Sequence, residues 1–266
     1  MSELLKASGV GKRFGGVLAL ANVSFAIARG EIYGLIGPNG AGKTTLFNLL
    51  TGIYSPDRGS FDLNGKNITG LKPDQVAFAG IARTFQNIRL FASLSALENV
   101  MIGRHVRTRA GVLGAVLRNR ATVDEERATE RRALELLDYV GMRARANDAA
   151  GSLPYGDQRR LEIARALATD PVLLALDEPA AGMNAAETIA LRGLLERIRA
   201  DGVTLLLIEH DMRLVMNVCD RVLVLDYGEK IAEGPPAAMQ RDARVIEAYL
   251  GVAPGEPVLS GDSSAA

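Results

Sequence analysis

Residues Gly37–Thr45 read GPNGAGKTT, and this stretch decides the fold of the chain. It matches the pattern G-x-x-x-x-G-K-[ST] and lies between an apolar run, Glu31–Ile36, and a segment of helical character, Leu46–Leu50. Glycines let successive backbone N–H groups turn towards phosphate oxygens, and the start of the following helix adds its positive end. A strand, this loop and a helix therefore predict a nucleotide-binding α/β domain.

Two side chains of the loop have separate expected roles. Lys43 supplies a positive charge for the β- and γ-phosphates, and Thr44 offers a hydroxyl to Mg²⁺. The alternative is a glycine-rich turn without a ligand, which the complete motif between strand and helix outweighs. The residues of this stretch expected to contact the nucleotide are Gly37, Pro38, Asn39, Gly40, Ala41, Gly42, Lys43, Thr44 and Thr45.

The composition is that of a folded chain with one large domain or one domain and a subdomain. It has 266 residues, 48% of them hydrophobic and 23% charged, and a formal net charge of zero, which gives no reason to expect nucleic acid as a partner. A single cysteine, Cys219, excludes an intrachain disulfide, and two histidines are too few for a His-rich metal site. The first residues lack the apolar run of a secretory signal, and no stretch reaches the roughly 18–20 apolar residues of a spanning helix. We therefore expect a cytoplasmic, soluble chain that docks on a membrane component.

Strand patterns occur in both halves of the chain. Within Val17–Ile27, the apolar residues Val23, Phe25 and Ile27 recur with a period of two, and an Asn-Gly turn within Phe61–Lys66 predicts a hairpin. Val172–Leu176 and Val203–Ile208 are apolar throughout, as central parallel strands are, and a helix over Ala185–Ala200 would join them.

The segment between these halves has a different character. Residues Ser95–Met142 carry many Arg and Glu residues, and Ala133, Leu136, Leu137 and Val140 recur at the spacing of one helix face. We expect a helical subdomain, about residues 95–165, inserted between strands of the core. One domain would then cover residues 1–251, and residues 252–266, rich in Pro, Gly, Ser and Ala, would form a disordered tail.

Polar residues follow two of the predicted strands. Asp177 and Glu178 come at the carboxyl end of a strand, the edge at which the phosphate loop of an open α/β sheet lies. Asp177 suits Mg²⁺ held through water, and Glu178 suits the orientation or deprotonation of an attacking water. His210 ends the neighbouring strand and can reach a γ-phosphate. Gln86 could supply an amide oxygen to Mg²⁺ and a contact to the water.

A second helix start offers another anion site. Residues Leu153–Leu167 join a short Gly-containing turn to a helix with Leu161, Ala164 and Ala168 on one face. Its free N–H groups can bind an anion. It comes too close before the acidic strand to be a second phosphate loop, so its target is expected to be a phosphate bound to another subunit.

The order of these motifs resembles the nucleotide-binding subunit of an ATP-binding cassette (ABC) transporter, over about residues 4–250. Four segments are similar, more narrowly, to the branched-chain amino acid importer ATPases: Arg83–Phe91, Tyr155–Arg165, Ala180–Asn184 and Val245–Gly251. The resemblance implies a P-loop NTPase core of ABC cassette type, with an antiparallel β subdomain and the inserted helical subdomain. It also implies binding and hydrolysis of ATP with Mg²⁺.

The resemblance further implies an assembly. A second cassette, commonly a different chain, two integral membrane permease subunits and a periplasmic or extracellular solute-binding protein would complete a transporter at the inner or plasma membrane. It implies that Phe14 stacks on adenine and that Asn87–Glu98 faces a membrane subunit. By the same resemblance, Gly156 serves the nucleotide site, and Asn184 lies in the loop that crosses between cassettes.

One segment departs from the family pattern. Residues 153–157 read LPYGD where the general signature is Leu-Ser-Gly-Gly-Gln. Pro154 lacks both the serine hydroxyl and a backbone N–H, whereas Gly156 keeps its backbone donor. Asp157 could cap the helix, although its charge would repel phosphate if it turned that way.

Two alternatives stay open. The chain could serve a transporter of another solute, such as urea or lipopolysaccharide, because a cassette does not touch the cargo. It could also be a soluble ABC ATPase acting on ribosomes or DNA, but such proteins usually carry two cassettes or long inserts, and this chain has neither.

Overall fold

The core of the fold is a mainly parallel sheet. The computed structural model describes residues 2–108, 120–210 and 212–250, and within them six strands follow the order β10-β9-β3-β8-β7-β6. All neighbours are parallel except β10, which pairs antiparallel with β9. The strands are β3 (Ile32–Ile36), β6 (Ile81–Arg83), β7 (Leu173–Asp177), β8 (Thr204–Ile208), β9 (Arg221–Asp226) and β10 (Glu229–Gly234).

The expected parallel strands are confirmed. β7 and β8 cover the two predicted apolar runs within one residue at each end, and all of their residues are buried. β3 lies between β8 and β9, so the strand that leads into the phosphate loop is central in the sheet. Burial on both faces explains why these strands show no alternation of apolar and polar residues.

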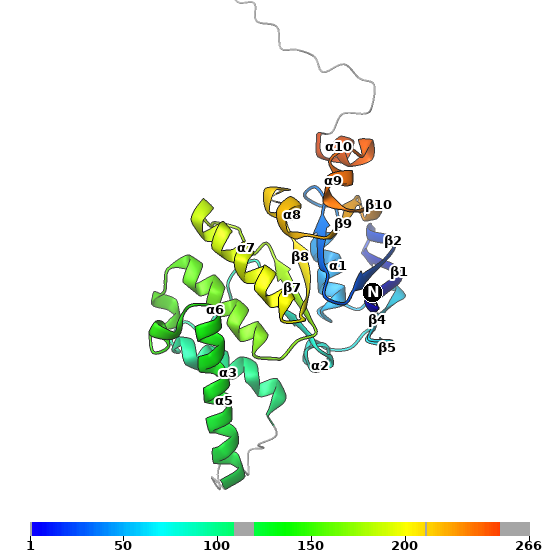
Figure 1. The fold of residues 1–266 in the computed structure, drawn as a ribbon. Coiled ribbons are helices and arrows are strands. Elements are labelled where there is room, and N and C mark those ends of the chain that lie inside the picture. Colours follow the sequence, from blue (N-terminus) through cyan, green and yellow to red (C-terminus); the bar gives the residue numbers. More distant parts are fainter. Residues whose placement is uncertain (1, 109–119, 211, 251–266) are drawn as a thin grey trace, which may run out of the picture.

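A second, antiparallel sheet has the order β2-β1-β4-β5. Its strands are β1 (Glu3–Phe14), β2 (Val17–Ala28), β4 (Arg58–Leu63) and β5 (Lys66–Asn67). The β4–β5 hairpin turns at Asn64 and Gly65, both with positive φ (52° and 72°), as an Asn-Gly turn requires. Buried side chains of this sheet, of the large sheet and of α1 (Lys43–Leu50) share one apolar core, so α1 packs between the two sheets (Figure 1).

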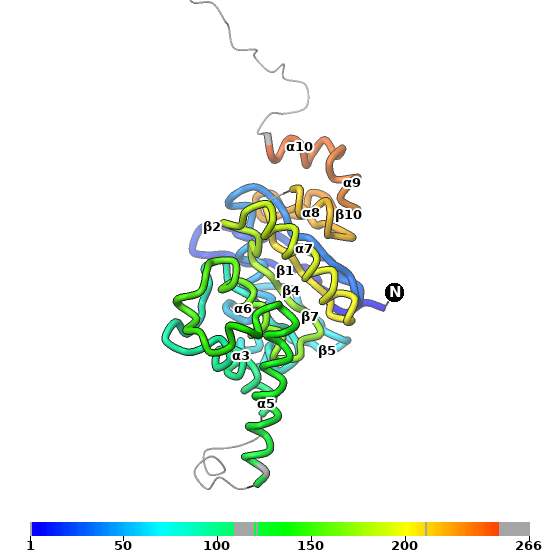
Figure 2. Tube along the Cα trace, turned by 60° about the vertical axis from the view of Figure 1, so that its left-hand side comes forward, coloured from blue at the N-terminus to red at the C-terminus, as the bar shows by residue number. Residues whose placement is uncertain are grey.

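A helical region is inserted between β6 and β7 of the chain, as expected. It contains α3 (Ala96–Arg104), α5 (Arg120–Tyr139) and α6 (Tyr155–Leu167), with the short 3₁₀ turns η1 (His105–Arg107), η2 (Arg143–Arg145) and η3 (Ala150–Ser152). These helices lie on the side of the molecule away from the antiparallel sheet, and α5 extends outwards from it (Figures 1 and 2). The predicted apolar face of α6, with Leu161, Ala164 and Ala168, is completely buried.

The remaining helices surround the large sheet. They are α2 (Pro73–Ala79), α7 (Ala185–Ala200), α8 (Met212–Val218), α9 (Pro236–Met239) and α10 (Ala243–Leu250). α7 has the predicted bounds because Asn184 and Glu187 form a capping box at its start. Its side towards the sheet buries Leu191, Leu194, Leu195 and Ile198.

Three smaller expectations can be compared with the structure. Cys219 is buried, and burial raises the pKa of its thiol to about 12, in keeping with an inert side chain. Within the described ranges, every helix is too short or too polar to cross a membrane. The expected disordered tail, residues 252–266, lies outside the described residues.

Candidate active site

The phosphate loop fits closely against neighbouring backbone. Gly37 has a φ of 148°, and a Cβ atom there would lie 2.1 Å from the carbonyl oxygen of Leu225. Gly42 has a φ of 102°, and a Cβ there would lie 2.8 Å from the carbonyl oxygen of Ala19 in β2. A side chain at either position would displace the loop, so its shape depends on these two glycines.

Lys43 begins α1 with its ammonium group over the loop. Nζ donates hydrogen bonds to the carbonyl oxygens of Gly37 (2.6 Å) and Pro38 (2.9 Å). Burial lowers the pKa of Lys43, while the charges of Glu178 and Asp177 act in the opposite direction. A buried cation between backbone oxygens and two carboxylates suits the neutralisation of phosphate. Thr44, next in the same turn, is exposed.

Asp177 is the last residue of β7 and is almost completely buried. Burial raises the pKa of its carboxyl; Arg83 acts in the opposite direction, and the nearby charge of Glu178 raises it further. The backbone N–H of Asp177 donates to the hydroxyl of Thr84, 3.4 Å away on the strand end beside it. The Asp177 carboxylate therefore lies in a confined place in which a bound cation would strongly favour its ionised form.

Arg83, for which no sequence motif predicts a role, lies near this acid, and its charge opposes the rise in the pKa of the Asp177 carboxyl that burial causes. Its guanidinium carbon lies 4.6 Å and 4.4 Å from the ring centroids of Phe47 and Phe85. It donates hydrogen bonds to Asn48 (3.1 Å) and Thr51 (2.7 Å), both on or next to α1. Arg83 thus ties the strand end at β6 to the helix that follows the phosphate loop. Both hydrogen-bond partners lie more than thirty positions away in sequence, so no local pattern predicts them.

Glu178 is the point at which the predicted catalytic residues meet. It has a left-handed backbone conformation (φ 45°), and its N–H donates to the carbonyl oxygen of Ile208 in β8 (2.9 Å). Gln86 Nε2 donates to Glu178 Oε2 at 3.1 Å, and His210 Nδ1 lies 3.5 Å from the same oxygen. A strained backbone that aims a carboxylate into a group of polar side chains is typical of functional sites.

Phe14 ends β1, and 41% of its surface is exposed. Its ring meets that of Tyr54 edge to face, with the centroids 5.3 Å apart, and the Lys12 ammonium lies 5.5 Å from its centroid. The contact of Gly42 with Ala19 brings the β1–β2 hairpin against the phosphate loop. An exposed aromatic ring at this place can offer a face to a planar base.

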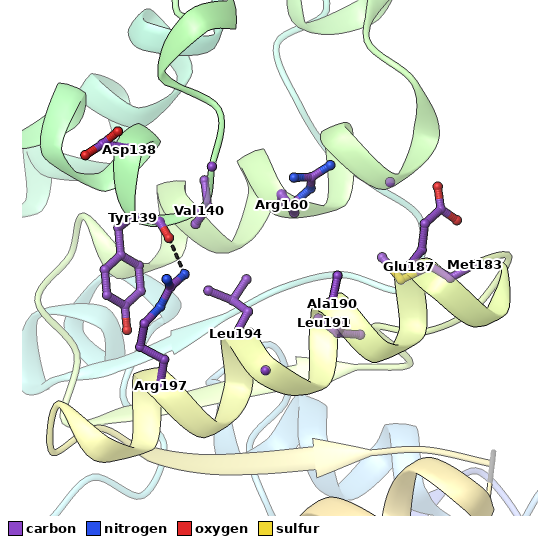
Figure 3. Close-up of a pocket in the computed structure, with 13 residues that line it drawn as sticks. Asp138, Tyr139, Val140, Arg160, Met183, Glu187, Ala190, Leu191, Leu194 and Arg197 are labelled. Atoms are coloured by element: carbon purple, nitrogen blue, oxygen red, sulfur yellow. Dashed lines mark hydrogen bonds between the residues drawn. The ribbon is translucent and has the colours of Figure 1, made fainter.

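The segment with the sequence LPYGD forms the start of α6, and here the structure corrects one expectation. α6 begins at Tyr155 with Pro154 as its N-cap residue, so Gly156 lies inside the first turn and not in a turn ahead of the helix. A Cβ at Gly156 would lie 2.8 Å from Glu187 Oε1 of α7. Gly156 lines a pocket of about 310 Å³ between α6 and α7, across which Arg160 and Glu187 are seen in Figure 3. The α6 start thus faces α7.

Asp157 is not the cap of α6, which corrects a second expectation. It is the third residue of the helix, and its side chain is 10% exposed. The carboxylate forms ion pairs with Arg160, on the same helix, and with Arg145 Nε at 3.2 Å. Two guanidinium groups therefore compensate the charge that was expected to repel phosphate.

Comparisons with known proteins agree with this geometry. Residues 20–181 match the family model described as ABC transporter, and residues 229–254 match the model described as branched-chain amino acid ATP-binding cassette transporter. The chain is 45% identical over 251 residues, 94% of this chain and 98% of the relative, to the high-affinity branched-chain amino acid transport ATP-binding protein LivG of Salmonella typhimurium. It is 44% identical, with the same coverage, to the corresponding protein BraF of Pseudomonas aeruginosa.

Solved structures give the same result for the fold. A crystal structure of a nucleotide-free ATP-binding cassette from an ABC transporter superposes with a TM-score of 0.83 at 32% identity, covering 94% of this chain and all of the other. The family model covers more than half of the residues and includes the phosphate loop, the Gln86 segment, the α6 start and Glu178. The chain belongs to the ABC transporter family, in which it is an ATP-binding subunit that hydrolyses ATP.

Proposed function

We propose that this chain couples ATP hydrolysis to the import of branched-chain amino acids, as one of two cassettes that meet across their nucleotides. The observation that carries the proposal is the meeting of Gln86 and His210 at the carboxylate of Glu178, whose charge acts on Lys43 of the phosphate loop. The printed names of LivG and BraF, and the family match at residues 229–254, support the cargo.

In the proposal, ATP lies along the phosphate loop. Backbone N–H groups of residues 37–45 surround its phosphates, and Lys43 neutralises the β- and γ-phosphates. The adenine stacks on Phe14, a contact that needs no base-specific hydrogen bond. The exposed ring of Phe14 supports the adenine contact, and the hydrogen bond from the Lys43 ammonium to the Gly37 carbonyl supports the phosphate contact.

We assign Mg²⁺ to the hydroxyl of Thr44, the amide oxygen of Gln86 and, through water, the carboxylate of Asp177. These donors are oxygens, the ligands that Mg²⁺ prefers, and the remaining positions would be filled by phosphate and water. In the part of the chain that the structure describes, no group of three or more His, Cys, Asp or Glu side chains could hold a metal by itself. When bound, the ion would neutralise charge on the β- and γ-phosphates.

Glu178 is the proposed general base. Its carboxylate would orient the attacking water and accept its proton, and Gln86 would fix the carboxylate through the 3.1 Å hydrogen bond. His210, 61% exposed at the side chain, would contact the γ-phosphate from the neighbouring strand end. Gln86, Glu178 and His210 follow β6, β7 and β8, so the proposed hydrolytic site depends on three strand ends that meet at one edge of the sheet.

The proposed assembly uses the other faces of the chain. Gly156, at the α6 start, would donate to the nucleotide of a second cassette, which in this family is commonly a different chain, and Asn184 would lie between the two. Permease subunits would contact Asn87–Glu98, where Phe91 is 49% exposed. A periplasmic or extracellular solute-binding protein would deliver the cargo, with this chain at the cytoplasmic face of the membrane. The net charge of zero gives no support for a nucleic acid partner.

Uptake in whole cells tests this function. In a strain without this chain and without other importers of leucine, isoleucine and valine, uptake of labelled leucine should be absent. It should return with the wild-type chain and with the surface control Lys66→Ala, but not with Lys43→Ala. The latter loses a charged contact with phosphate, which should weaken ATP binding by about 10- to 100-fold. Normal leucine uptake without the chain would refute the cargo, and loss of urea uptake instead would indicate the other solute class.

A further inference from the structure

A buried ion pair on α6 holds the segment that contains Gln86. The side chains of Arg159 and Glu162 are 0% and 1% exposed, and Arg159 Nη1 lies 2.9 Å from Glu162 Oε2. We refer to residues Phe85–Arg89 as the Gln86 loop and to the two charged residues as the Arg159–Glu162 clamp.

The clamp holds the loop by its backbone. Arg159 donates to the carbonyl oxygens of Phe85 (2.7 Å) and Gln86 (2.9 Å). Glu162 Oε1 accepts from the N–H groups of Phe85 (3.2 Å) and Arg89 (3.5 Å). These four contacts leave the Gln86 side chain free to reach Glu178. They also fix the position from which it does so.

The same arginine reaches the start of α6. Arg159 Nη2 donates to the Tyr155 hydroxyl at 3.2 Å, and Tyr155 is adjacent to Gly156. On its other side the Tyr155 ring packs at Gly182, where a Cβ would lie 3.3 Å from the ring. One residue therefore links the Gln86 loop, the α6 start and the loop after Glu178.

Stability alone gives a weak reason for such a pair. Ion pairs taken out of water are often no better than apolar side chains of the same volume. Burial raises the pKa of Glu162, so ionisation of this carboxyl in the fold has a cost that Arg159 and the backbone donors oppose. Among the described residues, Arg159 Nε is also one of two buried side-chain nitrogens without a hydrogen-bond partner. The two buried charges cost free energy of desolvation and lie where the Gln86 loop, the α6 start and the loop after Glu178 meet. This combination indicates that the pair serves to position these segments.

We propose that the Arg159–Glu162 clamp joins the Gln86 loop to α6 as one rigid unit, so that engagement of the α6 start with the opposite nucleotide sets the position of Gln86 against Glu178. Arg159 and Glu162 are positioning residues that act through Gln86 and touch no reacting atom. The inference rests on the proposed role of Gln86. It adds that the contact of the α6 start with the opposite nucleotide moves the Gln86 loop of the same chain.

The test removes both charges together, so that neither is left buried alone. Arg159→Met/Glu162→Leu also removes the partners of four backbone groups and the Glu162 contact of Arg165, so its thermal midpoint should fall, and turnover is compared at a temperature at which both chains are folded. ATP should bind the unassembled chain with unchanged affinity. In the assembled transporter kcat should fall by about 10- to 100-fold with little change in KM, because displacement by about 1 Å is enough to impair catalysis. The matched control is Arg192→Met/Glu196→Gln, which removes an exposed i,i+4 pair on α7 and should leave kcat unchanged.

Two further variants separate the possible outcomes. Gln86→Ala should lower kcat, and in that background the clamp variant should have little additional effect, because both changes act through one side chain. Arg159→Lys keeps the charge with fewer donors and should retain part of the wild-type kcat, so it gives the same comparison if the double variant does not fold. A wild-type kcat in the folded clamp variant, or full additivity with Gln86→Ala, would overturn the clamp alone. An unchanged kcat in Gln86→Ala would overturn the clamp together with the role of Gln86.

Discussion

The carboxyl edge of the parallel sheet and the start of α6 differ in how complete they are within one chain. At the sheet edge, Asp177 and Glu178 at the end of β7 come together with Gln86 after β6, His210 after β8 and Lys43 at the start of α1. At the α6 start, Gly156 lies against Glu187 of α7. In the proposed function, the first region binds and hydrolyses a nucleotide, and the second donates to the nucleotide of another cassette. Under that proposal, the chain carries two unlike halves of a shared site.

The largest effect is expected from breaking the sheet edge. Glu178→Gln keeps the shape and the contact with Gln86 but removes the basic oxygen, so turnover should fall by about 10²- to 10⁴-fold while ATP still binds. Nucleotide titration, steady-state turnover and gel filtration with ATP would measure this, and an ATP-dependent larger species should accumulate. Turnover near the wild-type rate would remove Glu178 from the role of general base.

Breaking the α6 start should affect only the partner's site. Gly156→Asp adds a side chain where a Cβ already lies 2.8 Å from Glu187 and adds a negative charge near an expected phosphate. Turnover of the assembled transporter should fall by about 10- to 100-fold, while the isolated chain binds ATP as before. The outcome that contradicts the comparison is weakened ATP binding in the isolated, folded variant.

The buried carboxylate of Asp177 at the sheet edge should lower the stability of the nucleotide-free chain at high pH. The pKa of Asp177 is raised, so the folded chain binds this proton more tightly than the unfolded chain, and ionisation above that pKa lowers stability. Without nucleotide, Asp177→Asn should therefore have a higher thermal midpoint than the wild type at pH 8, and the difference should shrink as the pH falls through the raised pKa. Melting curves at several pH values would show this. A variant that is less stable at pH 8 would contradict the sign.

The smallest effect is expected from restoring the family serine. Pro154 is the N-cap residue of α6, and no side-chain capping hydrogen bond is formed there. Pro154→Ser adds a hydroxyl that can cap the helix or donate to the opposite phosphate, a net gain of about 0.5–1.5 kcal/mol. Turnover of the assembled transporter should be equal or about 2-fold faster. A large loss of turnover would indicate that the proline ring holds the turn in place.

Sequence patterns predicted the elements whose signals are local. α7 has a capping box and a buried stripe, and β7 and β8 are unbroken apolar runs. The short strand β6 has only three residues, so its pattern carries no such signal. β1 has bulges, where its pairing with β2 shifts register between Val10 and Lys12, and these interrupt the alternation.

The site shows the same division between local and distant signals. The residues of the phosphate loop and the acids after β7 belong to short motifs, so the sequence assigns them roles directly. The carbonyl groups of Gln86 and Phe85 that accept from Arg159 lie 73 and 74 positions away, and Arg145, which pairs with Asp157, comes from a separate 3₁₀ turn. The spacing of Arg159 and Glu162 is a helical i,i+3 pair, which is usually a solvated one, and only the packing of α6 against the Gln86 loop reveals its burial.

The place of β3 between β8 and β9 also has a consequence for synthesis on the ribosome. At about 5–20 residues per second, the two strands that flank β3 follow it by roughly 10 to 40 s. Until they emerge, the apolar strand Ile32–Ile36 has neither of its neighbours in the sheet. The phosphate loop is thus made well before the two strands that give it its fixed surroundings. A nascent chain that ends before Arg221 contains the complete phosphate-loop motif but lacks β9, one of the two strands that hold β3 in the sheet.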